Sequence, residues 1–353
     1  MSGVLKKQRV YELDYIRAIS AIFIVLFHYT TQYNNSIGHI GSWPVSVPWG
    51  SMAVNTFFLL TGYLTVCHYS SGFLQFVYKR WCRLWPAFAV CVIITSAFMA
   101  LLMPERLRTI PDILINFTMF PAYLGAKAVD GVYWTLPVEI IFYFWIAVIL
   151  CLTKKRKKLL MICLYGWTAL SIIVSLFSKL NFLPLPTSLL QIGFNTLHAP
   201  CFIIGIAIFL QNADDGVSWK STLPLLFLCV AGVYLGRGLS LTVWTTLWAL
   251  LIWAVTAGKL HFSLKKKNPV HKCLVFLAGI SYPLYLLHQF IGFAIIQKLE
   301  HLGAVNELWI IVPIVFSILL ATAVHYWVEI PAGNLLLKLL KKKAPTQNNT
   351  QTQ

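Results

Sequence analysis

The sequence predicts an all-α integral membrane protein, a bundle of about ten transmembrane helices with the N- and C-termini in the cytoplasm. Two observations predict the class. Of the 353 residues, 58% are hydrophobic and only 11% are charged, whereas soluble proteins average about 45–50% and about 25%. Apolar segments of about 17–25 residues, the length that crosses a bilayer, recur along the whole chain. A third observation, the distribution of basic residues, predicts the sidedness.

Ten apolar segments qualify as spans. They lie near residues 14–33, 50–69, 84–103, 133–152, 159–177, 191–210, 221–236, 240–257, 273–293 and 308–328. Only a short turn around Gly236, Arg237 and Gly238 separates the seventh span from the eighth. Because ten is an even number of crossings, both termini should lie on one side of the membrane.

The basic residues predict which side that is. The chain carries 28 Lys and Arg against 11 Asp and Glu. With the N-terminus inside, 21 of the basic residues fall in cytoplasmic segments and 6 on the opposite side, while Arg17 lies within the first span. Such an excess of Lys and Arg marks cytoplasmic loops. The net charge of +17 therefore reports topology, and no nucleic-acid partner is expected.

The domain organisation is simple. Residues 1–335 should form one ten-helix transmembrane domain, and residues 336–353 a basic and then polar cytoplasmic tail that is disordered. The eight cysteines fall in spans or at their cytoplasmic ends, so no external disulfide framework is expected. No P-loop, dinucleotide-binding or zinc pattern occurs, and no bound metal is expected.

Ionisable residues inside spans cost about 2.5–3.5 kcal/mol each, so each one suggests a functional site. The first span carries Asp14, Arg17 and His28. The eleven residues from Arg17 to His28 advance about 1100°, roughly 20° beyond three full turns, so the three side chains share one helix face. The alternative is an Asp14–Arg17 pair that caps the helix and a hydrogen-bonded core histidine.

Two other spans carry polar groups at a similar depth. Glu139 follows Trp134 in YWTLPVEIIFYF, and His288 ends the stretch GISYPLYLLH. Counted from the cytoplasmic ends at about 1.5 Å per residue, His28, Glu139 and His288 all lie roughly 20–22 Å into the membrane. The alternatives are an interfacial belt role for Trp134 and a packing seam around a neutral core His288. His325 and Glu329, four residues apart, are predicted to form a structural pair.

These residue types indicate a chemistry. Histidines and a carboxylate at one level, with no activated Ser or Cys beside them, favour general-base catalysis. Arg17, Arg80 and Arg83 gather at the inner face, where VYKRWCRLWP leads into the third span. They predict an anionic ligand, because guanidinium groups bind phosphate bidentately.

Six motifs in order make the sequence resemble the acyltransferase family 3 membrane proteins, which include bacterial O-antigen and polysaccharide O-acetylases. The likeness covers nearly the whole chain. Thr61 stands where the family usually has Ser. The motifs are ELDYIRAISAIFIVLFHY with the R-x10-H spacing of Arg17 and His28, FFLLTGYL, the R-x-x-R of Arg80 and Arg83 before Pro86, YWTLPVEIIFY, GISYPLYLLH and VEIP.

The resemblance implies a multi-pass enzyme of the plasma (inner) membrane, without an appended extracytoplasmic domain. Such an enzyme moves an acyl group, usually acetyl, from cytoplasmic acyl-CoA to a hydroxyl of a cell-surface or lipid-linked carbohydrate. Acetyl-CoA would be a substrate, and no tightly bound cofactor is implied. The rival function is a proton-coupled multi-pass transporter, because such carriers use intramembrane Asp, Arg, His and Glu. The sequence shows no internal repeat, which disfavours that rival.

The resemblance also implies roles for single residues. His28 would be the general base, with Glu139 as the second catalytic residue. Arg80 and Arg83 would bind the CoA phosphates, and Arg17, beside Asp14, would support the donor or the base. The residues that would orient the acceptor or stabilise the oxyanion are Glu139, Trp134, Tyr282 and His288.

Overall fold

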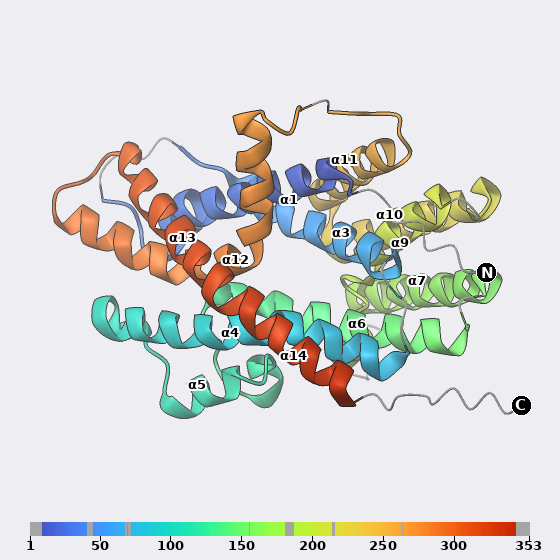
Figure 1. Ribbon diagram of the computed structural model, residues 1–353, viewed down its shortest axis with the longest axis horizontal. Coiled ribbons are helices and arrows are strands. Elements are labelled where there is room, and N and C mark those ends of the chain that lie inside the picture. The colour runs from blue at the N-terminus through green and yellow to red at the C-terminus, as the bar shows by residue number, and fades with distance from the viewer. Residues whose placement is uncertain are drawn as a thin grey trace, which may run out of the picture.

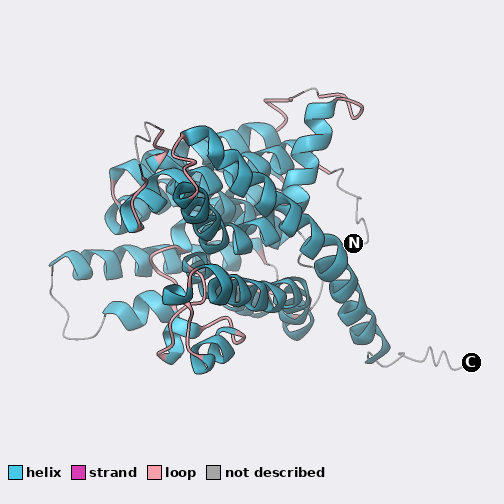
Figure 2. Ribbon diagram, turned by 90° about the vertical axis from the view of Figure 1, so that its left-hand side faces the viewer, coloured by secondary structure: helices cyan, strands magenta, loops and turns pink. Residues whose placement is uncertain are grey.

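The computed structural model describes residues 9–40, 45–67, 69, 72–154, 156–180, 187–213, 216–262 and 264–343. These residues form helices joined by loops and contain no strand, which confirms the predicted all-α class (Figure 2). The polar end of the predicted tail, residues 344–353, lies outside the described residues.

Most of the described chain belongs to fourteen α-helices and to short π- or 3-10 turns. The α-helices and four of these turns are α1 (Tyr11–Phe27), η1 (His28–Gln32), α2 (Tyr33–Ser36), η2 (Pro48–Met52), α3 (Ala53–Cys67), α4 (Phe73–Leu102), α5 (Ile110–Asn116), η5 (Gly131–Trp134), α6 (Thr135–Leu152), α7 (Lys157–Leu180), α8 (Thr187–Gly193), α9 (Ala199–Asn212), α10 (Trp219–Arg237), α11 (Leu239–Thr256), α12 (Pro269–His301), α13 (Ile311–Val324), η7 (His325–Glu329) and α14 (Ile330–Lys343). Figure 1 shows α3, α9, α10 and α11 gathered in one part of the molecule and α4, α6 and α14 in another.

Nine helical segments among the described residues are long and apolar enough to cross a membrane, so the chain is a multi-pass membrane protein. They are Tyr11–Ser36, Pro48–Cys67, Phe73–Leu102, Gly131–Leu152, Lys157–Leu180, Trp219–Arg237, Leu239–Thr256, Pro269–His301 and Glu307–Leu339. The sixth predicted span, residues 191–210, is broken: α9 is an apolar helix of only 14 residues, and a loop separates it from α8. The number of ten crossings and the cytoplasmic termini stay predictions.

Two predicted boundaries differ from the structure. Helix α4 begins at Phe73, about ten residues before the predicted span, and continues through Pro86. Arg80 and Arg83 therefore lie on the helix and not in a segment that leads into it. At the other end of the chain, α14 continues to Lys343, so the predicted domain boundary at residue 335 falls inside a helix.

Three helix pairs run parallel. Helix α1 follows α12, because Tyr15 contacts His271 near the start of both and Tyr33 contacts Glu300 near their far ends. Contacts in the same order align α3 with α9, through Phe58–Phe202 and Tyr63–Phe209, and α7 with α10, through Tyr165–Ser221 and Thr168–Cys229. Parallel neighbours bring side chains from distant parts of the sequence to the same depth.

Glycines allow the closest of these approaches. A Cβ atom on Gly62 of α3 would overlap the carbonyl oxygen of Phe202, and one on Gly205 of α9 would overlap that of Leu59. Small residues at such interfaces let two helix backbones pack closely in a membrane. Gly292 serves α12 in the same way, because a Cβ there would collide with the ring of Tyr29.

Candidate active site

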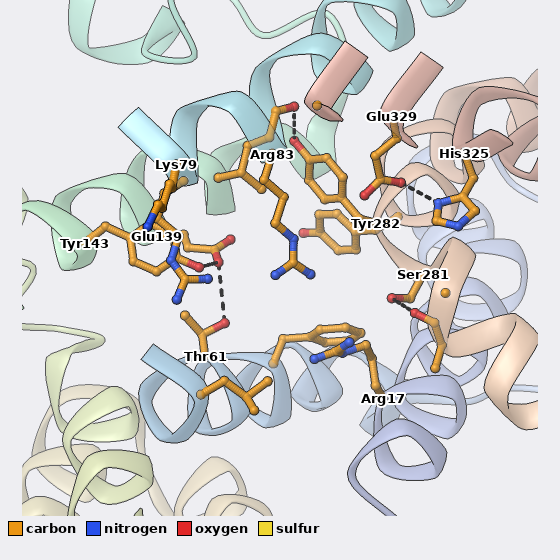
Figure 3. Close-up of a pocket in the computed structure, with 18 of the residues that line it drawn as sticks. Arg17, Thr61, Lys79, Arg83, Glu139, Tyr143, Ser281, Tyr282, His325 and Glu329 are labelled. Carbon is orange, nitrogen blue, oxygen red and sulfur yellow. Dashed lines mark hydrogen bonds and ion pairs between the residues drawn. The ribbon is translucent and has the colours of Figure 1, made fainter. Parts of the chain in front are cut away.

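A cavity of about 1080 Å³ opens among α1, α3, α4, α6, α12 and the segment from η7 to α14 (Figure 3). Its volume lies slightly above the range of typical ligand pockets, about 300–1,000 Å³. Six of the nine residues predicted for the site line it, and they come from four different helices. These six are Asp14, Arg17, Arg80, Arg83, Glu139 and Tyr282.

Positive charge dominates the cavity. Its lining contains Arg9, Arg17, Lys79, Arg80, Arg83 and Lys338 against Asp14, Glu139 and Glu329. Asp14 takes a 2.7 Å ion pair from Arg9 and lies 4.0 Å from Arg17. The other four cations have no carboxylate within 4.0 Å among the described residues. Since unpaired guanidinium groups favour anions, the cavity fits a ligand with several negative charges.

Arg80 is held by aromatic rings. Its guanidinium carbon lies 4.9 Å from the centre of the Tyr143 ring and 5.2 Å from that of Phe76. Phe76 precedes it by one turn of α4, and Tyr143 comes from the neighbouring α6. Such cation–π contacts fix the direction of a cation without neutralising it. The charge of Arg80 therefore remains available to a ligand.

Glu139 lies in the cavity wall. Its Oε1 accepts hydrogen bonds from the hydroxyls of Tyr143, at 2.5 Å, and Thr61, at 3.4 Å (Figure 3). The Tyr143 ring also contacts the Arg80 guanidinium. No hydrogen bond among the described residues joins Glu139 to His28 or His288. Glu139 therefore orients the Tyr143 ring on which Arg80 rests.

The two histidines contact each other directly. His288 Nε2 lies 3.1 Å from His28 Nδ1, and the ring centres are 4.7 Å apart. His28 is also the first residue of the π-helical turn η1. Such turns occur mostly as single insertions in α-helices, often at functional sites. The equal depth predicted for these two residues thus corresponds to a contact between α1 and α12.

The surrounding carbonyl groups assign the tautomers of this histidine pair. His288 Nδ1 lies 2.9 Å from the Tyr285 carbonyl, so it carries a proton and leaves Nε2 as an acceptor. His28 Nδ1 lies 2.9 Å from the Ile24 carbonyl and donates to that oxygen and to His288. His28 Nε2 therefore keeps its lone pair, and no side chain among the described residues donates a hydrogen bond to it. A neutral imidazole with a free Nε2 is suited to accept a proton.

The histidine pair lies beyond the deep end of the cavity. His28, His288 and Trp134 are not among the lining residues, whereas Tyr285 and Phe57 are. The Tyr285 ring lies 5.8 Å from that of His288. Tyr282, one turn before Tyr285, lines the cavity and donates its hydroxyl proton to the Leu84 carbonyl. One layer of side chains thus separates the arginine-rich cavity from the histidines.

Sequence reasoning missed two features of this region. His325 Nδ1 bonds Glu329 Oε2 at 2.7 Å as predicted, but the pair faces the cavity, on the π-helical turn η7 (Figure 3). Asp130 was also missed: it is buried and accepts the backbone N–H of Phe290 at 3.0 Å, which ties the start of η5 to α12. Its position just before a span was the available signal.

The cysteines and possible metal ligands add little to the site. All eight cysteines are free thiols, and none of them lines the cavity. Among the described residues, no group of three or more His, Cys, Asp or Glu side chains is arranged to hold a metal ion.

Fold and site together define a multi-pass helical membrane protein with a cationic cavity that ends near a pair of histidines. The chain belongs to acyltransferase family 3, because the family described as "Acyltransferase domain" matches residues 10–327. The chain is therefore a multi-pass membrane protein of this family.

Two further comparisons accompany this match. Nodulation protein 10 of Rhizobium leguminosarum bv. viciae is 26% identical over 168 residues, which cover 41% of this chain and 45% of that protein. The chain thus aligns with less than half of this curated relative. No solved structure matches.

Proposed function

We propose that the protein is an O-acyltransferase of the plasma membrane. It moves an acyl group, which in its family is usually acetyl, from cytoplasmic acyl-CoA to a hydroxyl of a cell-surface or lipid-linked carbohydrate. The observation that carries this proposal is the arginine-rich cavity with the histidine pair just beyond its deep end. Family membership supports the reaction class.

The donor would bind in the cavity. CoA carries phosphate groups at one end and the thioester at the other. Arg80, Arg83 and Arg17 would hold the phosphates, because guanidinium groups bind phosphate with charge-assisted hydrogen bonds. The thioester arm would extend along the cavity toward Tyr285 and past it to the histidines.

His28 would act as the general base. The acceptor oxygen bonds to the thioester carbonyl carbon while its proton moves to His28 Nε2. The tetrahedral intermediate then breaks its C–S bond, and His28 returns the proton to the departing CoA thiolate. His288 would act as a positioning residue, because its Nε2 holds the Nδ1 proton of His28 and so keeps Nε2 of His28 free.

Glu139 would support donor binding through Tyr143 and Arg80. Its hydrogen bond to Tyr143 orients the ring beneath Arg80. We therefore propose a positioning role for Glu139 in donor binding, in place of the catalytic role that the sequence motif implied. Tyr282 would shape the cavity wall, since its hydroxyl proton is already donated to Leu84.

The test is acyl transfer by the purified full chain in lipid nanodiscs. Labelled acetyl-CoA is supplied together with a lipid and glycan extract, and release of CoA thiol and label in the carbohydrate fraction are measured. Wild type should show both. His28→Ala should lower the transfer rate about 10²–10⁴-fold, the usual contribution of general-base catalysis.

His301→Ala is the matched control. His301 lies exposed at the last position of α12, on the same helix as His288, and its substitution should leave the rate unchanged. Full activity in His28→Ala would refute the general-base assignment. Absence of acetyl-CoA binding and of CoA release in wild type would refute the proposed donor.

A further inference from the structure

A second cluster of polar and aromatic side chains adjoins the cavity, because its member Phe58 also lines the cavity. Arg237, the last residue of α10, places Nη1 3.0 Å from Nδ1 of His198, the residue before α9. The His198 ring lies 5.5 Å from the ring of Trp134, at the end of η5. Phe58 packs against both rings, at 5.4 Å and 6.5 Å. Residues of α3, η5, α10 and the loop before α9 thus meet in one cluster.

This cluster lies at the end of the bundle opposite the donor. Lys179, near the end of α7, sits over the ring of Tyr234, one turn before Arg237. Helix α7 has 24 residues and so extends about 36 Å back to the basic run that begins it. By the distribution of basic residues, the cluster belongs to the outer half of the membrane.

Arg237 is a cation that forms no ion pair with the described residues. No carboxylate lies within 4.0 Å of it among the described residues. Its partner, His198, is a buried imidazole that accepts from the guanidinium and is therefore neutral at that nitrogen. A partly desolvated charge gains most from a partner of opposite sign, so the cluster lacks an anionic group.

Trp134 adds an open aromatic surface beside this charge. The residue is 44% exposed although its ring contacts His198 and Phe58. An indole face offers a large apolar area with a polar N–H at its edge. Such a face packs against the C–H face of a sugar ring. Charge and ring together fit a carbohydrate that bears an anionic group.

A chain of contacts joins the cluster to the two histidines His28 and His288. Thr135, next to Trp134, has its hydroxyl 3.1 Å from that of Tyr285. Tyr285 lies beside His288, which bonds His28, and both Thr135 and Tyr285 line the donor cavity. A ligand on Trp134 would therefore adjoin the point where the thioester arrives.

We propose that Trp134, His198 and Arg237 form the acceptor subsite and that the acceptor is an acidic carbohydrate. The sugar ring packs on Trp134, and its phosphate or carboxylate binds Arg237 through charge-assisted hydrogen bonds. The inference rests on the proposed function. Two acceptors share this chemistry, a lipid-linked sugar diphosphate and a glycan that contains uronic acid.

The experiment measures binding of three probes to the full chain in nanodiscs. The probes are a polyprenyl-diphosphate-linked N-acetylglucosamine, an oligosaccharide of glucuronic acid and a neutral glucose oligosaccharide. Arg237→Gln should weaken binding of an anionic probe about 10–100-fold, the value of charge-assisted hydrogen bonds, and leave the neutral probe unaffected. Arg237→Lys should retain a preference for the anionic probe. Trp134→Ala should weaken every probe that binds.

Lys179→Gln is the matched control, because it removes a positive charge from the same end of the bundle without touching the cluster. It should bind all probes as wild type does. Whichever anionic probe responds to Arg237→Gln identifies the phosphate or the carboxylate as the recognised group. Equal binding of both anionic probes to wild type and Arg237→Gln, or no binding at all, would overturn the subsite.

Release of CoA from acetyl-CoA without any acceptor is measured on the same samples. If wild type releases CoA but Arg237→Gln changes no probe affinity, the acceptor subsite is wrong and the proposed function stands. If acetyl-CoA neither binds nor loses its acyl group, the proposed function itself fails.

Discussion

The two ends of the α1–α12 pair differ in how their charged side chains are paired. At one end, the arginine-rich cavity has more cations than carboxylates, and Arg83 has no ion pair among the described residues. At the other end, the Glu300 carboxylate is 1% exposed and fully engaged: His39 Nδ1 lies 2.7 Å from Oε1, and the Tyr33 hydroxyl donates to Oε2 at 2.9 Å. His39 Nε2 in turn contacts the Tyr29 carbonyl.

This difference distinguishes charged groups that are available to a ligand from charged groups that only stabilise the fold. Buried polar groups that serve only the fold are hydrogen-bonded, because an unsatisfied one destabilises the folded state. The Glu300 network meets this rule within the chain. Arg80, which is half-buried, and Arg83, which is exposed, have no carboxylate within 4.0 Å among the described residues, so we expect their partner to come from a ligand in the cavity. Substitutions at the two ends should therefore affect different measurements.

The largest effect is expected at the cavity end. Arg83→Gln should raise the KM for acetyl-CoA about 10–100-fold, because it removes charge-assisted hydrogen bonds to a phosphate. The thermal stability of the unliganded protein should not fall, since no ion pair of the fold is lost. Steady-state CoA release and thermal unfolding of the same sample measure both quantities.

Arg156→Gln is the control, because Arg156 lies at the predicted cytoplasmic side but does not line the cavity. An unchanged KM in Arg83→Gln, or a KM that rises equally in both variants, would remove Arg83 from the donor site.

A substitution in the Glu300 network should lower the stability of the fold and leave the KM for acetyl-CoA unchanged. Glu300→Gln keeps the size of the side chain but loses the charge that holds His39 and Tyr33. We expect a loss of about 1–3 kcal/mol in the free energy of unfolding, the usual consequence of leaving buried partners unsatisfied. The KM for acetyl-CoA of the folded fraction should stay at the wild-type value.

Glu307→Gln, on the segment after α12, serves as the control and should unfold as wild type does, since Glu307 forms no ion pair with the described residues. A Glu300→Gln protein that keeps full stability but loses donor affinity would contradict the division between the two ends.

The smallest effect is expected at a partly exposed carboxylate, Asp112, which already has hydrogen-bond partners within the chain. Asp112, near the start of α5, accepts hydrogen bonds from the Thr109 hydroxyl and the Lys127 backbone N–H, and these bonds lower its pKa from 3.8. The folded state therefore holds the charge more strongly than the unfolded state. Its contribution to stability is present above pH 3.8 and is lost as the pH falls through the lowered pKa.

Thermal unfolding of Asp112→Asn at several pH values checks this expectation. The midpoint should lie slightly below that of wild type at neutral pH, by less than in Glu300→Gln, and the two proteins should converge in acid. A difference that is independent of pH would show that the Asp112 charge does not act through these hydrogen bonds.

Much of the site followed from the sequence because helix geometry is periodic. The face shared by Asp14 and Arg17, and the depth shared by His28 and His288, depend only on residue spacing. The direct contact of the two histidines depends also on α1 and α12 being parallel neighbours, which spacing within one helix does not reveal. The same limit explains His325: its pairing with a glutamate one turn away is local, but its direction toward the cavity is set by tertiary packing.

The cluster around Arg237 was hidden for a related reason. In the sequence, Arg237 lies in a short turn and counts as one more charge outside the membrane. Its contact with His198 requires the break before α9, which interrupts a segment whose composition predicts one continuous span. The start of α4 at Phe73 was missed because hydropathy measures transfer into lipid, whereas Arg80 and Arg83 face a polar cavity.

The parallel registration of α1 and α12 also bears on the transporter alternative. The two helices are joined at their beginnings by Tyr15 and His271, midway by His28 and His288, and at their far ends by Tyr33 and Glu300. The Tyr29 ring fills the space above Gly292, so neither helix slides past the other without a collision. Alternating access needs one bundle to rock against another. The proposed reaction needs only a stationary centre: donor and acceptor would meet at it from opposite faces, and neither molecule would have to cross the membrane.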